Sequence, residues 1–240
     1  SSLIASRAEG LRPDRIERLA DEIATLKKQG REILIVSSGA IVSGIKKLQL
    51  KEYPKNLPVK QAAAAVGQSR LMWAYEKAFE HLSIQVAQIL LTHQDLEDRR
   101  RFLNARHTLS TLIDFGIIPI INENDTVAVD EIRVGDNDTL ASEVAHLADA
   151  DLLVILSDVD GLYTEDPRRN PSATLIPFIP AITDDIERLA GMSSTFEGTG
   201  GMATKLRAAK KVGQYGVSTL ILSGERAGLL ASALTTGTVA

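Results

Sequence analysis

Residues 116–140 read GIIPIINENDTVAVDEIRVGDNDTL, and this stretch determines the fold that we expect. An apolar run from Ile117 to Ile121, interrupted by Pro119, predicts a short buried strand. The polar residues 122–125 (Asn-Glu-Asn-Asp) follow at once. A strand of the core thus delivers polar side chains to its carboxyl end.

A second group of Asp and Asn residues lies about a dozen positions later. Residues 127–134 predict a hairpin, and residues 135–139 (Gly-Asp-Asn-Asp-Thr) predict the cap of a helix that continues through residues 141–145. Ligands of open α/β sheets bind outside the carboxyl ends of the strands, so we expect a site here. The alternative is that Asn and Asp serve only as turn and cap residues.

Composition bounds the class of protein. A chain of 240 residues can form one large α/β domain or two small ones. The net charge of −4 argues against general nucleic-acid binding, and the absence of cysteine excludes disulfides and thiolate metal sites. The four histidines show no paired ligand spacing. No apolar run approaches the ~18 residues of a membrane span and no signal peptide opens the chain, so we expect a soluble cytoplasmic protein without a membrane partner.

Strands and helices alternate along the whole chain. Apolar runs predict strands at residues 32–36, 84–91, 151–156 and 218–222, and helical periodicity or capping predicts helices from residue 13 to Gly30 and at 41–45, 61–81, 95–115, 183–190 and 225–234. This alternation predicts the α/β class, as a three-layer α/β/α sandwich with a mainly parallel open sheet. No linker divides residues 1–240, which favours a single domain.

An alanine run at residues 62–65 predicts close packing between helices. We expect Trp73, Tyr75 and Phe79, which follow on the same helix, to be core or interface residues.

Two loops have the composition of phosphate sites. Residues 37–40 (Ser-Ser-Gly-Ala) join a strand to a helix, where free N–H groups and the helix dipole favour an anion. Gly198, Gly200 and Gly201 precede a helix that carries Lys205 one turn later, a combination that can cradle a phosphate. The alternatives are an ordinary helix cap at the first loop and a flexible loop with a helix cap at the second. Neither a Walker A motif nor a dinucleotide fingerprint is present.

Phosphoryl transfer requires positioning and charge neutralisation, which glycine N–H groups, a lysine and an aspartate can supply. If a carboxylate is the acceptor, no general base is needed, because that group is already ionised at neutral pH.

Seven motifs occur in the order of a known family. They are VSSGA (36–40), AAVGQSRL (64–71), RFLNAR (101–106), PIINEND (119–125), VGDND (134–138), GLYTEDPR (161–168) and GTGGMATK (198–205). With these motifs the chain resembles the amino acid kinase family. The resemblance implies transfer of the ATP γ-phosphoryl group to the γ-carboxylate of L-glutamate, giving L-glutamyl 5-phosphate in the first step of proline biosynthesis. A sibling such as an acetylglutamate kinase-like enzyme, an aspartokinase or a uridylate kinase would share the architecture, but PIINEND together with VGDND favours free glutamate.

The resemblance also implies roles for particular residues. Ser38 and Gly39 resemble the glutamate-binding turn, and Asp125 and Asn137 resemble the ligands of the glutamate amino and carboxylate groups. Asp138 resembles the aspartate that organises the catalytic lysines, and Lys205 resembles a lysine that stabilises the transferred phosphoryl group. The ATP-binding residues implied are Ser157, Asp158, Thr199, Gly200, Gly201, Met202, Ala203, Thr204 and Lys205. Mg²⁺ would be carried by the ATP phosphates and waters, with no protein side chain assigned to it.

The chain departs from the family pattern at its ends. Family members begin with a strand that carries a further catalytic lysine, whereas this sequence begins at Ser1, so we expect that first strand to be missing. Many bacterial members continue into a small RNA-binding-like PUA domain, which we do not expect here. A catalytically disabled sensor of glutamate or proline is therefore an alternative to the enzyme. The family also implies a homo-oligomer, dimer or tetramer, built through residues 62–79 or 102–112, and feedback inhibition by L-proline.

Overall fold

A computed structural model describes residues 3–6, 8–128, 136–167, 169–192 and 201–236. The chain forms two compact units. The first unit consists of Ser1–Val134 with Ala227–Ala240, and the second unit consists of Gly135–Arg226. None of the helices in the described ranges is both long and apolar enough to cross a membrane.

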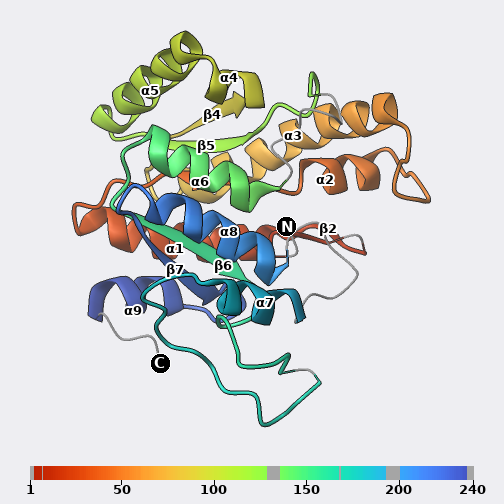
Figure 1. Cartoon of the computed structure of the whole chain (residues 1–240). Helices are drawn as coiled ribbons and strands as arrows, with labels where there is room; N and C mark the ends of the chain where they lie inside the picture. Colours follow the sequence, from red (N-terminus) through yellow and green to blue (C-terminus); the bar gives the residue numbers. More distant parts are fainter. Residues whose placement is uncertain (1–2, 7, 129–135, 168, 193–200, 237–240) are drawn as a thin grey trace. The chain divides into compact units, whose positions relative to one another are not determined.

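A parallel three-stranded sheet forms the centre of the first unit (Figure 1). Strand β5 (Ile118–Glu123) lies between β3 (Ile35–Val36) and β4 (Val86–Leu91), and both neighbours run parallel to it. The buried strand predicted from the isoleucine run is confirmed, because every residue of β5 except Glu123 is buried. The strand extends through Asn122 and Glu123, so the sheet positions these polar residues directly. A short antiparallel pair, β1 (Ala5–Ser6) and β2 (Gly10–Leu11), accompanies this sheet.

Helices cover both faces of this sheet. Figure 1 shows α5 on one side of β4 and β5 and α3 on the other. The helices of the first unit are α1 (Pro13–Lys28), α2 (Ala40–Lys47), α3 (Leu57–Glu80), α4 (His93–Glu97), α5 (Arg99–Asp114) and α9 (Leu229–Thr236). This layering accounts for the burial of β5 on both faces.

Helices α2 and α3 are in backbone contact. A Cβ atom added to Gly67 would lie 1.7 Å from the Ala40 carbonyl oxygen, and one added to Gly44 would lie 1.7 Å from the Ala63 carbonyl oxygen. The close packing predicted from the alanine run is therefore confirmed.

The three aromatic residues predicted on α3 differ in their burial. Tyr75 and Phe79 are buried, as predicted for the core, but Trp73 is 61% exposed. Trp73 lies two positions before Tyr75, and this spacing turns it to another side of a helix. Trp73 is thus not a core residue of this chain, and its place in an interface stays a prediction.

Several helix boundaries differ from the sequence prediction, among them the start of α9 at Leu229 instead of residue 225, and side-chain caps account for two of the differences. The helix predicted at residues 95–115 is two helices, because Asp98 ends α4 and caps α5 by accepting a hydrogen bond from the Arg101 N–H at 2.9 Å. Helix α3 begins four residues earlier than predicted, because Asn56 accepts a hydrogen bond from the Val59 N–H at 3.3 Å.

The second unit contains a pair of parallel strands with helices packed on them. Strands β6 (Leu152–Ser157) and β7 (Ser218–Ser223) pair in register, and α6 (Asn137–Leu147) and α8 (Met202–Gly213) pack on them. Their core consists of Leu153 and Ile155 of β6 with residues from both helices. Helix α7 (Asp184–Met192) packs against α8.

The predicted α/β class with mainly parallel open sheets is confirmed by these pairings. Most of the hairpin predicted at residues 127–134 lies outside the described residues. The organisation of residues 1–240 as one domain stays a prediction.

Candidate functional site

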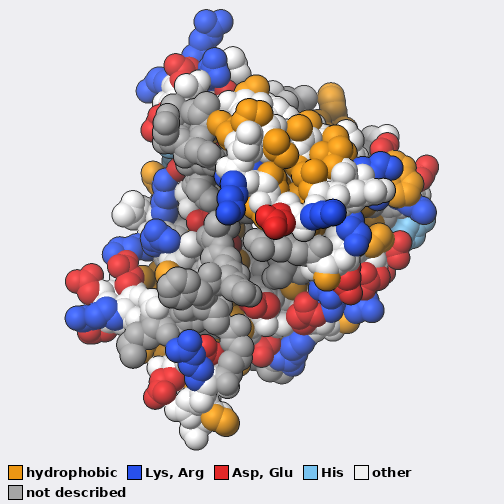
Figure 2. Space-filling model, turned by 90° about the vertical axis from the view of Figure 1, so that its right-hand side faces the viewer, with side chains coloured by type: hydrophobic (Ala, Val, Ile, Leu, Met, Phe, Trp, Pro, Cys, Tyr) orange, Lys and Arg blue, Asp and Glu red, His pale blue; other side chains and the backbone are white. Residues whose placement is uncertain are grey.

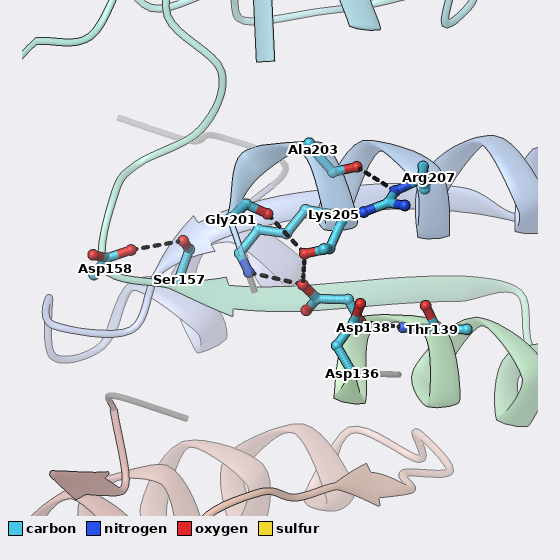
Figure 3. Close-up of polar contacts among 10 residues, drawn as sticks. Asp136, Asp138, Thr139, Ser157, Asp158, Gly201, Ala203, Lys205 and Arg207 are labelled. Atoms are coloured by element: carbon cyan, nitrogen blue, oxygen red, sulfur yellow. Dashed lines mark hydrogen bonds and ion pairs between the residues drawn. The ribbon is translucent and has the colours of Figure 1, made fainter. Parts of the chain in front are cut away.

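An aspartate and a lysine meet in the second unit (Figure 3), and a threonine bonds to the same aspartate. Asp138 lies in the first turn of α6, and Thr204 and Lys205 lie in the first turn of α8. The Lys205 Nζ atom is 3.0 Å from Asp138 Oδ2, and the Thr204 hydroxyl donates to the same oxygen at 2.6 Å. The structure therefore brings together the two residues to which the resemblance assigned catalytic roles, and adds Thr204 to them.

Two helix starts hold this cluster in place. The Asp136 carboxylate accepts a hydrogen bond from the Thr139 N–H at 2.8 Å, which begins α6 and fixes Asp138 in its first turn. At the start of α8, the Gly201 carbonyl accepts from the Thr204 N–H at 3.1 Å and faces the Thr204 hydroxyl at 2.7 Å. A hydroxyl has one hydrogen, so Thr204 donates to Asp138 or to Gly201 but not to both at once.

The ion pair between Lys205 and Asp138 is largely shielded from water. The Lys205 side chain is 10% exposed and the Asp138 side chain is 16% exposed. Buried charges are costly unless they are paired and hydrogen-bonded. Asp138 thus offsets the cost of burying the Lys205 side chain at the start of α8, where a phosphate would also meet the positive end of the helix dipole.

The implied nucleotide segments lie near strand ends and a helix start. Ser157 is the last residue of β6, and its hydroxyl donates to the Asp158 carboxylate at 3.2 Å. The Ser157 carbonyl accepts from the Gly224 N–H at 2.8 Å, just beyond the end of β7. This is the carboxyl edge of a parallel sheet, where α/β proteins bind ligands.

The start of α8 has the features of an anion site. Gly201 caps the helix without a side-chain bond, and Met202 and Ala203 open its first turn, where the N–H groups have no intrahelical acceptor. Thr199 and Gly200, which the resemblance also assigns to ATP, lie outside the described residues.

The residues assigned to glutamate divide between the two units. Ser38 and Gly39 join β3 to α2 in the first unit. Gly39 has a φ of +102°, and a Cβ atom there would lie 2.8 Å from Ala5 Cβ, so this turn requires glycine. Asp125 follows β5 in the same unit, whereas Asn137 is the first residue of α6 in the second unit, next to Asp138.

A chain of three amides, of which Asn122 and Gln68 are buried, was not predicted from the sequence. The Asn122 side chain in β5 donates to Gln68 of α3 at 3.0 Å, and Gln68 donates in turn to Gln88 of β4 at 3.2 Å. The signal that could have revealed it is the occurrence of glutamine inside otherwise apolar segments, AAVGQ and VAQILL. These bonds fix the Asn122 side chain at the carboxyl end of the central strand.

Side chains that could hold a metal ion are not grouped in the part of the chain that the structure describes. No set of three or more His, Cys, Asp or Glu residues there has the arrangement of a metal site.

Burial would raise the pKa of Asp95 at the start of α4, but hydrogen bonds from Thr92 and Arg101 outweigh it and lower that pKa. That shift therefore reflects helix capping.

Comparison with known proteins identifies the class to which this α/β chain, with its paired lysine and aspartate, belongs. Residues 1–223 match the model of the amino acid kinase family, and the chain belongs to this family. The fold is shared with T. acidophilum isopentenyl phosphate kinase in its product complex, at a TM-score of 0.62 and 18% identity over 98% of this chain and 92% of that one. It is also shared with a carbamate kinase from Giardia lamblia bound to AMP-PNP, at a TM-score of 0.62 and 18% identity over 93% of this chain and 86% of that one.

Curated relatives are more similar in sequence. The glutamate 5-kinase of Geobacter metallireducens is 57% identical over 97% of this chain, and that of Carboxydothermus hydrogenoformans is 56% identical over 86% of it. The chain spans 62% of the length of the first relative and 55% of the second.

Proposed function

We propose that this protein transfers the γ-phosphoryl group of ATP to the γ-carboxylate of L-glutamate, forming L-glutamyl 5-phosphate in the first step of proline biosynthesis. The observation that carries the proposal is the shielded cluster of Asp138, Thr204 and Lys205 in a chain 57% identical to a glutamate 5-kinase. A lysine held by an aspartate at a helix start is suited to a transferring phosphoryl group, because negative charge develops there in the transition state.

In this proposal the second unit binds ATP. Ser157, Asp158 and the start of α8 would hold the nucleotide, and Lys205 would neutralise the moving phosphoryl group. Mg²⁺ fits as a companion of ATP because it binds phosphate oxygens and waters readily. Bound there, the ion would neutralise charge on the phosphates.

Glutamate would be recognised through its charges. Asp125 would bind the ammonium group and Asn137 the α-carboxylate, while Ser38 and Gly39 would contact the substrate at the start of α2, whose dipole favours an anion. The γ-carboxylate of glutamate, with an ordinary pKa near 4.3, is ionised at neutral pH. The reaction therefore requires no general base, and none is assigned.

The test traps the acyl phosphate with hydroxylamine. The chain is incubated with Mg-ATP and L-glutamate, and γ-glutamyl hydroxamate is measured beside N-acetylglutamate and aspartate as acceptors. A second sample carries the N-terminal segment of the Geobacter metallireducens relative before Ser1, because the resemblance leads us to expect a lysine strand there. Hydroxamate formed with glutamate in either sample supports the proposal. Turnover only with N-acetylglutamate or aspartate would assign a sibling activity, and calorimetric binding of glutamate or proline without any turnover would assign a sensor.

We also propose a homo-oligomer that assembles through residues 62–79 or 102–112. Trp73 on α3 is 61% exposed and Leu103 on α5 is 40% exposed. Figure 2 shows hydrophobic side chains gathered in the upper part of one face, at the height that α3 and α4 occupy in Figure 1. Sedimentation of the wild type and of Trp73→Glu would test this, since a monomeric wild type would refute it.

A cytoplasmic location and inhibition by L-proline complete the proposal, and titration of the hydroxamate assay with proline would test the latter.

A further inference from the structure

Tyr75 carries a buried hydroxyl behind the glycine turn of the first unit. Its side chain on α3 is 1% exposed, and its hydroxyl oxygen lies 3.0 Å from the Ser37 Oγ atom. Burial raises the pKa of Tyr75 to about 12, although the hydrogen bond with Ser37 acts in the opposite direction. The residue is therefore a neutral phenol at physiological pH, and a buried phenol requires a polar partner.

Ser37 connects this phenol to the turn. The Ser37 N–H donates to the Ile121 carbonyl of β5 at 2.8 Å, which fixes its backbone against the central strand. The Ser37 hydroxyl lies 3.4 Å from the Ser38 carbonyl, toward which it donates. Either hydroxyl could donate in the contact between Ser37 and Tyr75. When the Ser37 hydrogen is directed to the Ser38 carbonyl, Ser37 accepts the hydrogen of Tyr75, and a relay then runs from Tyr75 through Ser37 to that carbonyl.

The end of this relay orients one peptide group. The Ser38 carbonyl belongs to the peptide that also contains the Gly39 N–H, and the two point in opposite directions across a trans peptide. Gly39, at a φ of +102°, is also the N-cap of α2. Because the Ser38 carbonyl is held toward the Ser37 hydroxyl, the Gly39 N–H points away from Ser37. The same constraint fixes the conformation of the turn from which α2 presents its first N–H groups.

We infer that Tyr75 is a positioning residue for the acceptor substrate, which acts through Ser37 on the Ser38–Gly39 turn. The inference rests on the proposed function, because it assigns this turn to glutamate. Tyr75 itself touches no reacting atom in this scheme. Its contribution is to keep the carboxylate-binding N–H groups in one orientation before substrate arrives.

The test compares Tyr75→Phe, which removes only the hydroxyl, with Ser37→Ala, which removes the middle of the relay. In the sample that forms hydroxamate, each variant is expected to raise KM for glutamate about 3- to 10-fold, the effect of one lost hydrogen bond. The kcat value and KM for ATP should change less than about 2-fold. The double variant should resemble the single ones, because either change breaks the same relay.

Phe79→Leu is the packing control. Phe79 is fully buried one turn further along α3, so its truncation should lower Tm without raising KM for glutamate. An unchanged KM for glutamate in Tyr75→Phe and Ser37→Ala would overturn this inference, and so would equal increases in KM for glutamate and ATP. Either result would leave the proposed function standing. A wild type that forms no hydroxamate with glutamate would remove the proposed function and this inference with it. If Tyr75→Phe does not fold, Ser37→Ala decides.

Discussion

Replacing Asp138 by asparagine tests the cluster at the start of α6 and α8. Asp138→Asn keeps the shape of the side chain and removes its charge. At the 3.0 Å separation of Lys205 Nζ and Asp138 Oδ2, the Coulomb attraction is about 5.5 kcal/mol with an effective dielectric constant of about 20. Desolvation of the two charges offsets much of this attraction, and the net value of a hydrogen bond to a charged group is about 1.5–3 kcal/mol.

We therefore expect Asp138→Asn to lower the free energy of unfolding by about 1.5–3 kcal/mol. If Lys205 acts on the transferring phosphoryl group, the same loss of positioning should lower kcat by about 10- to 150-fold, at about 1.4 kcal/mol per factor of ten. Urea denaturation measures the first effect, and hydroxamate formation at saturating ATP and glutamate measures the second.

Glu143→Gln is the matched control. Glu143 of α6 pairs with Lys211 of α8, so this ion pair joins the same two helices further along their length. The Lys211 side chain is 41% exposed, and exposed pairs contribute about 0–1 kcal/mol. We expect little loss of stability and an unchanged rate. A kcat reduced less than threefold in Asp138→Asn, or reduced equally in Glu143→Gln, would refute the role assigned to the cluster.

Three further predictions concern stability: one tests helix packing, one a helix cap and one the pH dependence of unfolding. Gly67→Ala places a Cβ atom 1.7 Å from the Ala40 carbonyl oxygen, so overpacking should exceed the gain of about 1 kcal/mol in helix propensity. We therefore expect a lower urea midpoint for Gly67→Ala. Gly213→Ala is the control, because a Cβ atom there would meet nothing within 4 Å and should not destabilise the protein. Equal midpoints for the two variants would contradict the close contact between α2 and α3. Glu22→Ala removes a carboxylate that accepts two backbone N–H groups at the start of α9, each at 3.0 Å. The loss of about 1–2 kcal/mol of capping energy should accelerate hydrogen exchange of the α9 amides. Unchanged exchange rates would exclude a capping role for Glu22. Because the pKa of Tyr75 is raised to about 12, its stabilising effect is complete below about pH 10 and is lost as pH rises toward 12. Between these values the wild type should lose about 1.4 kcal/mol per pH unit relative to Tyr75→Phe, and parallel urea-stability profiles for the two proteins would refute that shift.

The sequence was most informative where the determining interactions are local. The isoleucine run predicted β5 because an apolar run of that length needs a buried strand, and the structure buries it. Pro13 and the apolar periodicity after it predicted α1, which begins at Pro13. In both cases the residues that decide the structure are neighbours along the chain.

Long-range polar contacts could not be predicted from such patterns. Asp138 and Lys205 are 67 residues apart, and only the family resemblance suggested that they act together. The contact of Ser37 with Tyr75 spans 38 residues, and no spacing rule indicates it. Asp98 lies in a run of charged residues at positions 97–101, a composition typical of a solvated helix face, whereas the folded chain uses it to end one helix and begin the next. The same side chain suits a solvated surface and a cap, so composition does not separate the two.

The packing of α9 against α1 has a consequence for the order in which the protein folds as it is synthesised. The carboxylate of Glu22 binds the α9 N-terminus across 206 residues of sequence, and Arg31 binds the Leu234 carbonyl at 2.7 Å near its other end. The second unit is made from one continuous segment, Gly135–Arg226, which leaves the ribosome before α9 does. Translation therefore supplies all of the second unit while the first still lacks a helix, and the unit that begins the chain is the last to be completed.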